Sequence, residues 1–229
     1  MTDGLSTLFG NTGLAGNTGS LLPRSLVAGW LVTALAWLSA AAPAVEPSPG
    51  AVRTGIFGLE ADGNRFVYVF DRSASMGDPA GRPLAAAKRE LLRSLDELGP
   101  VQQFYVIFYN QRLQVFTPSG MRGRLVFATD DTKKAARRFV DSVRADGATR
   151  HADAIAAAIR LGPDAIFLLT DGDAVDDLDE EELGRLMRSI GGTKCMVVQF
   201  GGGEQRRSPR LARLAEASGG RYEVVENDP

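Results

Sequence analysis

Four short apolar runs, separated by longer segments of helical periodicity, constrain the fold of this chain more than any other feature. They cover residues 66–70, 104–109, 165–170 and 194–200. Runs of this length without polar alternation are typical of strands that are buried on both faces. Strands that alternate with helices form right-handed crossovers and a mostly parallel sheet. The sequence therefore predicts an α/β fold, Rossmann-like and doubly wound, with helices on both faces of a central sheet.

Helical spacing of apolar residues fills the intervals between these runs. Leu84, Leu91 and Leu95 recur in this way after the first run, and a Gly-Pro pair follows them as a stop signal. Residues 113–116 follow a polar turn after the second run and are predicted to pair with it as an antiparallel edge strand. The remaining predicted elements are helices over residues 132–143, 150–161 and 178–190, a helix after Ser208, and a last strand over 222–225.

The chain is long enough, at 229 residues, for one domain and a terminal extension. We predict a flexible tail over 1–25, a membrane anchor or signal segment over 26–45, a linker over 46–60 and one domain over 61–229. Residues 26–45 form a run of about 20 without a charge, close to the length that crosses a ~30 Å hydrocarbon layer.

Small residues near position 44 also fit the cleavage site of a secretory signal. Both interpretations of 26–45 place the domain outside the cytoplasm, in the periplasm or the extracellular space. The domain is membrane-anchored if the segment is kept and secreted if the chain is cleaved near residue 44.

Composition excludes several classes of function. One cysteine, Cys195, and one histidine, His151, leave no intrachain disulfide, no thiolate cluster and no histidine-based zinc site. A net charge of −2 provides no field that would attract nucleic acid, so no nucleic-acid partner is expected. We expect Cys195 to be buried in a strand and His151 to lie on the surface at the start of a helix.

Oxygen-bearing side chains follow two of the apolar runs. Asp71, Ser73 and Ser75 come directly after the first run, and Asp171 follows the third. In open α/β sheets, ligands bind in the crevice beyond the carboxyl ends of the strands. Carboxylates and hydroxyls are hard ligands of the kind that Mg²⁺ or Mn²⁺ prefers.

These residues resemble the metal-ion-dependent adhesion site (MIDAS) of von Willebrand factor A (VWA) domains, in the bacterial envelope type. The resemblance covers roughly residues 64–226 and rests on three separated elements in the family's order. They are Asp71-x-Ser73-x-Ser75 after an apolar strand, Gly147-Ala148-Thr149 before a helix, and Thr170-Asp171-Gly172.

The resemblance implies a divalent-cation site that is made by Asp71, Ser73, Ser75, Thr149 and Asp171. In that family the two serines bind the ion directly, Thr149 binds it in the ligand-occupied state, and the aspartates bind directly or through water. One departure is Ala148, where many members have a second glycine.

The implied function is cation-dependent binding of a protein that supplies an acidic side chain, and not catalysis. The alternative is a Mg²⁺-dependent phosphatase-like hydrolase with Asp71 as its nucleophile. Such enzymes usually carry a second aspartate two residues later as an acid and base, whereas this chain has Ser73 there.

Overall fold

The computed structural model describes residues 50–78, 81–118, 123–172, 178–201 and 207–226. The tail over 1–25 and the membrane or signal segment over 26–45 lie outside these residues and remain predictions. Within the ranges that are described, no helix has the length and apolar character needed to cross a bilayer.

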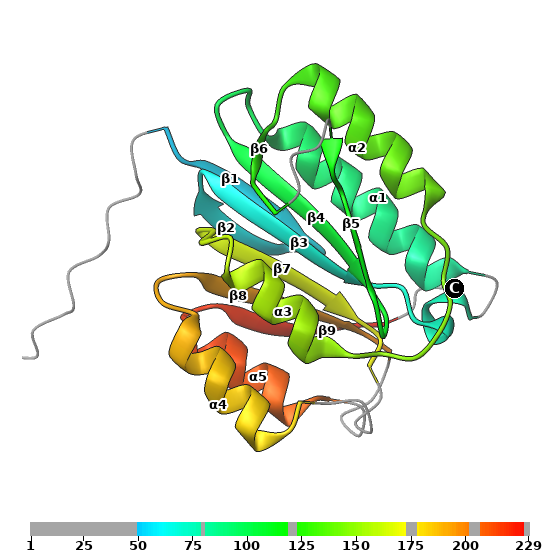
Figure 1. The fold of residues 1–229 in the computed structure, drawn as a ribbon, viewed down its shortest axis with the longest axis vertical. Helices are drawn as coiled ribbons and strands as arrows, with labels where there is room; N and C mark the ends of the chain where they lie inside the picture. Colours follow the sequence, from blue (N-terminus) through cyan, green and yellow to red (C-terminus); the bar gives the residue numbers. More distant parts are fainter. Residues whose placement is uncertain (1–49, 79–80, 119–122, 173–177, 202–206, 227–229) are drawn as a thin grey trace, which may run out of the picture. The chain divides into compact units, whose positions relative to one another are not determined.

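A central sheet of seven strands forms the middle layer of the domain (Figure 1). The strand order is β5-β4-β3-β7-β8-β9, and β6 pairs with the other end of β4. All pairs among β4, β3, β7, β8 and β9 are parallel, and β5 and β6 are antiparallel to β4. The strands are β3 (Arg65–Asp71), β4 (Gln103–Tyr109), β5 (Leu113–Val115), β6 (Val126–Phe127), β7 (Ala165–Thr170), β8 (Lys194–Phe200) and β9 (Arg221–Val225).

Helices cover both faces of this sheet, because alternate residues of the central strands point to opposite sides. Phe66 and Phe70 of β3 pack with α1 and α2 on one face, whereas Val67 and Val69 pack with α3, α4 and α5 on the other. This arrangement confirms the predicted doubly wound, mostly parallel α/β fold with an antiparallel edge strand. The helices are α1 (Arg82–Glu97), α2 (Asp130–Ser142), α3 (His151–Ile159), α4 (Glu180–Ser189) and α5 (Pro209–Ala217), with a short 3₁₀ helix, η1 (Ala74–Gly77).

A β-hairpin precedes the sheet and was not predicted. Strand β1 (Val52–Ile56) pairs antiparallel with β2 (Leu59–Gly63), and the connecting residues Phe57 and Gly58 both have positive φ angles, of 47° and 78°. Two-residue turns with this conformation match the natural twist of paired strands. β1 packs beside α1, and β2 packs over β7 and β8.

The predicted linker over 46–60 is therefore wrong for residues 52–60, which belong to the folded domain. Strand β2 alternates regularly, with Leu59 and Ala61 buried and Glu60 and Asp62 exposed. This alternation is the pattern of a half-buried strand. The strand could not be recognised in the sequence because it is only five residues long and two of them are charged.

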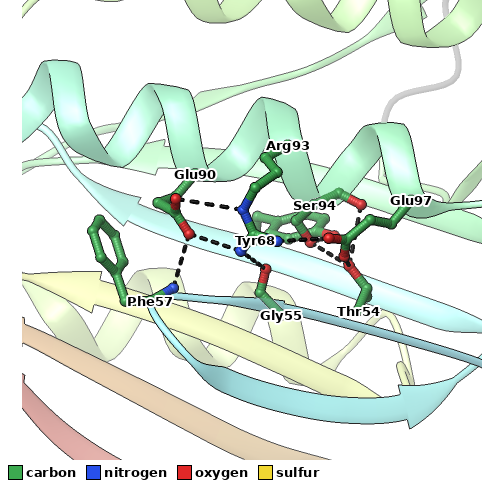
Figure 2. Close-up of polar contacts among 8 residues, drawn as sticks. All are labelled: Thr54, Gly55, Phe57, Tyr68, Glu90, Arg93, Ser94 and Glu97. Carbon is green, nitrogen blue, oxygen red and sulfur yellow. Dashed lines mark hydrogen bonds and ion pairs between the residues drawn. The ribbon is translucent and has the colours of Figure 1, made fainter.

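A buried polar cluster fastens the hairpin to α1 and β3 (Figure 2). The Thr54 hydroxyl lies 2.6 Å from Oγ of Ser94 and 2.7 Å from a carboxylate oxygen of Glu97. The Tyr68 hydroxyl from β3 lies 2.7 Å from the same Ser94 oxygen. Burial of these hydroxyls is tolerated because each has a hydrogen-bond partner. The cluster therefore joins three separate elements on one face of the sheet.

Candidate metal centre

The candidate site lies where the order in which the chain adds strands to the sheet reverses. β3 is the first strand of the parallel set; β4 follows it on one side, and β7 is added on the other side. The carboxyl ends of β3 and β7 thus meet at a topological switch point, the usual place for ligands in open α/β sheets. Asp71 is the last residue of β3, and Asp171 directly follows β7.

Asp71 is fully buried and is held in place by two hydrogen bonds. Its Oδ1 accepts the backbone N–H of Ser73 at 2.7 Å, and its Oδ2 accepts the Thr170 hydroxyl at 2.8 Å. Burial raises the pKa of Asp71 to about 6, against the lowering effect of the bonds from Ser73 and Thr170, and the nearby Asp171 carboxylate adds to the increase. The carboxylate therefore carries a negative charge that the surrounding protein stabilises poorly.

Ser73, Ser75 and Asp171 continue from Asp71 as a chain of hydrogen-bonded residues. The two serine hydroxyl oxygens are 3.1 Å apart, and the Ser75 hydroxyl donates to Oδ1 of Asp171 at 3.0 Å. Ser73 is buried, while Ser75 is exposed and Asp171 is half-buried. The structure thus brings together four of the five residues that the sequence singled out.

Thr149 lies on the loop between α2 and α3, and this loop packs against the loop that carries the serines. The Asp146 N–H donates to the Arg72 carbonyl at 2.9 Å, and the Ala74 N–H donates to the Gly147 carbonyl at 2.8 Å. Thr149 itself is half-buried. In the part of the chain that the structure covers, no hydrogen bond joins its side chain to the other four residues, so the loop is adjacent but Thr149 is not part of their network.

His151 is buried next to Gly172, which follows Asp171, and the expectation of a surface histidine is wrong. It does begin α3, but it is only 2% exposed, and its Nδ1 lies 2.9 Å from the Tyr109 hydroxyl. A Cβ atom on Gly172 would approach Nε2 of His151 to 3.2 Å. The glycine after Asp171 therefore leaves room for the imidazole ring beneath the end of β7.

Sequence reasoning missed three polar residues that shape the site, namely Arg72, Asn110 and Gln111. Asn110 and Gln111 follow the end of β4, beside the residues that follow β3, and they bond to the loop that carries Thr149. A signal was present, because polar residues at the carboxyl end of a central strand face the same crevice as Asp71.

The donor set fits a hard divalent cation. The described residues hold no group of three or more His, Cys, Asp and Glu side chains that would bind a metal by themselves. The candidate set instead combines the carboxylates of Asp71 and Asp171 with hydroxyls, which suits Mg²⁺ or Mn²⁺. The raised pKa of Asp71 agrees with this, because a bound cation would compensate a charge that no basic side chain of the described residues offsets.

The fold and the position of this site define a Rossmann-like domain with a cluster of oxygen-bearing side chains at the switch point. The profile of the von Willebrand factor type A domain family matches residues 64–224. The chain belongs to this family. Its members generally act in adhesion and protein binding and not in catalysis, and many bind a divalent metal at a MIDAS.

Known proteins show similarity over most of the domain. Human inter-alpha-trypsin inhibitor heavy chain H4 is 27% identical over 185 residues, which cover 75% of this chain and 19% of that protein. The chain thus spans about a fifth of the length of this relative. The solved structure of a von Willebrand factor type A protein from Catenulispora acidiphila is 26% identical, with a TM-score of 0.62, over 73% of this chain and 40% of that one. BatB from Bacteroides thetaiotaomicron shares the fold at 21% identity, with a TM-score of 0.51, over 72% of this chain and 92% of its own.

Proposed function

We propose that this protein is a cation-dependent protein-binding module with a MIDAS at the ends of β3 and β7. The observation that carries the proposal is the continuous set of contacts from Asp71 through Ser73 and Ser75 to Asp171, at the switch point of a VWA fold. Mg²⁺ or Mn²⁺ would be held by these four residues, with Thr149 as the fifth ligand.

The chemistry of the ligands favours an acidic partner. When bound, the cation supplies a coordination position that a carboxylate of another protein can occupy. Ser73, Ser75 and Thr149 are neutral, so they leave the positive charge less compensated than a site of carboxylates would. Ser75 is exposed and Asp171 is half-buried, so a partner side chain can approach the proposed site from their side.

We further propose that residues 26–45 anchor the domain in a membrane or export it, as in bacterial envelope members of the family. The support is the length of this uncharged segment and the small residues near position 44. Membrane fractionation of cells that express the full chain tests this. Full-length protein in the soluble cytoplasmic fraction would remove both the anchor and the signal interpretation.

Titration calorimetry with Mn²⁺ tests the metal site. Wild-type protein is expected to bind one Mn²⁺ per chain, and the double variant Asp71→Ala/Ser73→Ala is expected to lose this binding. The matched control is Asp131→Ala, which removes an exposed carboxylate at the start of α2. If the double variant binds Mn²⁺ as tightly as wild type, the site has been misplaced.

Affinity capture from a membrane extract, in Mg²⁺ and in EDTA, tests the binding function. A captured protein should be lost in EDTA, and replacement of its contacting acidic residue should weaken binding. Thr149→Ala should also weaken capture, and removal of the partner's acidic side chain should cost about 2 to 5 kcal/mol, the range for removing one member of a buried charged contact. Equal capture in EDTA would show that binding uses another surface.

A further inference from the structure

Arg72 lies inside the Asp71-to-Ser75 segment, at a position that no ligand role explains. Its backbone joins two neighbouring elements, because its N–H donates to the Tyr109 carbonyl at 2.7 Å and its carbonyl accepts the Asp146 N–H at 2.9 Å. The same residue therefore contacts the end of β4 and the loop that carries Thr149.

The Arg72 side chain turns away from solvent toward that loop. It is 12% exposed, and its Nη1 donates to the Arg144 carbonyl at 3.3 Å and to the carboxylate of Asp146. Its Nε is buried and has no hydrogen-bond partner in the described chain. A buried guanidinium is costly unless it is paired, so the ion pair with Asp146 is what makes this position tolerable. The Asp146 side chain is 68% exposed, so the ion pair attaches an exposed loop to the segment that carries the serines.

The turn between β4 and β5 holds the same loop from the other side. Asn110 is buried, and its Nδ2 donates to the Asp146 carbonyl at 2.7 Å and to Oδ1 of Asp146 at 2.8 Å. The side-chain oxygen of Gln111 accepts the Ala148 N–H at 2.8 Å. Consecutive residues of the loop are therefore fastened by side chains from a separate element.

Gly147 allows this close approach. Its φ is +74°, and a Cβ atom there would meet Oε1 of Gln111 at 2.2 Å and Nδ2 of Asn110 at 2.8 Å. The positive φ disfavours any larger residue, and the ends of the Gln111 and Asn110 side chains would have to move to make room for one. With the Gly147 carbonyl bonded to the Ala74 N–H, residues 146–148 are all fixed, and Thr149 follows directly.

We propose that Arg72, acting with Asn110 and Gln111, is the positioning residue for Thr149. This group, which we name the loop latch, holds residues 146–148 so that Thr149 is preorganised for the cation site before any cation binds. The inference rests on the proposed function, since it assigns Thr149 to the coordination of the ion. Holding the loop in advance reduces the conformational entropy lost on binding, which is the general advantage of preorganised sites.

A double-mutant cycle measured by Mn²⁺ calorimetry tests the loop latch. Thr149→Ala is expected to weaken Mn²⁺ binding about five-fold, within the usual range for a coupled contact. Arg72→Gln should weaken it by a similar factor, and the double variant should be no weaker than either single variant. Arg72→Lys, which retains the charge, should restore part of the affinity. Arg138→Gln is the control, because it removes an exposed arginine on α2.

The outcomes separate this inference from the proposed function. Additive losses in the double variant would overturn the loop latch while leaving the metal site in place, whereas absence of Mn²⁺ binding by wild type would overturn the proposed function itself. Amide hydrogen exchange without metal provides a second readout, because Arg72→Gln should speed exchange at Ala148 at least ten-fold while α1 stays protected. Asp146→Asn replaces Arg72→Gln in both experiments if the latter does not fold, and unchanged exchange at Ala148 would also refute the loop latch.

Discussion

Replacement of Asp71 by asparagine is expected to stabilise the cation-free domain while it removes the cation site. Asp71 is fully buried, and burial raises the pKa of its carboxyl to about 6 from an ordinary value of 3.8. Asparagine has the same shape and no charge. Its carbonyl oxygen can still accept the Ser73 N–H, and its NH₂ group can donate to the Thr170 hydroxyl, which accepts the Gly172 N–H and can accept a second bond.

The magnitude follows from the pKa. A carboxyl whose pKa is raised in the folded state binds more protons when folded than when unfolded, so stability falls as pH rises from about 4 to about 6. A difference of about 2 units at about 1.4 kcal/mol per unit corresponds to about 3 kcal/mol at neutral pH. Loss of the charge-assisted hydrogen bonds offsets part of this gain. We expect Asp71→Asn to raise the free energy of unfolding by about 1 to 2 kcal/mol.

Urea denaturation in EDTA measures this difference at two pH values. The advantage of Asp71→Asn should be about 2 kcal/mol larger near pH 7.5 than near pH 4.5, because the wild-type carboxyl is protonated in the folded state at the lower pH. Excess Mg²⁺ should then stabilise wild type but not the variant, because only wild type retains the site. A variant that is less stable than wild type by the same amount at both pH values would refute the reasoning.

Two further predictions concern packing away from the site. Thr54→Val keeps the shape of the side chain but removes the hydroxyl at the centre of the hairpin cluster. We expect the free energy of unfolding in urea to fall by about 1 to 3 kcal/mol, with unchanged Mn²⁺ affinity. Unchanged stability would show that the cluster does not stabilise the domain. Gly220→Ala would place a Cβ atom 2.0 Å from the Cys195 carbonyl oxygen, so we expect a loss of about 2 kcal/mol or more in thermal denaturation. The matched control is Gly192→Ala, where no atom lies within 4 Å, and an equal effect at both glycines would contradict the packing argument.

The central strands were predictable because their environment is uniform. The runs at 66–70, 104–109, 165–170 and 194–200 are buried on both faces, so nearly every residue is apolar and the signal is continuous. The hairpin at 52–63 was not predictable in the same way. Strand β2 has one buried and one exposed face, only the last three residues of β1 are buried, and the polar attachment of the hairpin depends on hydroxyls and a carboxylate contributed by different elements.

The candidate site likewise has some features that the sequence predicts and others that it does not. Asp71, Ser73 and Asp171 could be brought together from sequence, because parallel strands place their carboxyl ends at one edge of the sheet. Burial of His151 could not be predicted, because it depends on the Tyr109 hydroxyl and on the absence of a side chain at Gly172. Local sequence patterns describe faces of single elements, whereas these contacts depend on how three elements meet.

Unfavourable features are concentrated around this one crevice. Asp71 is a buried carboxylate with a raised pKa, and Nε of Arg72 is the one buried side-chain nitrogen or oxygen without a hydrogen-bond partner in the parts of the chain that are described. Each of these costs free energy in the cation-free domain, and the tightly packed sheet offsets the cost.

A cation would offset the buried charge of Asp71, but it would not supply a hydrogen-bond partner for Nε of Arg72. The two costs therefore have different origins: the first depends on the ion, and the second maintains the loop whether or not the ion is bound. Saturating Mg²⁺ should therefore abolish the loss of stability between about pH 4 and about pH 6 that Asp71 causes, and it should leave the contribution of the Arg72–Asp146 pair to stability unchanged.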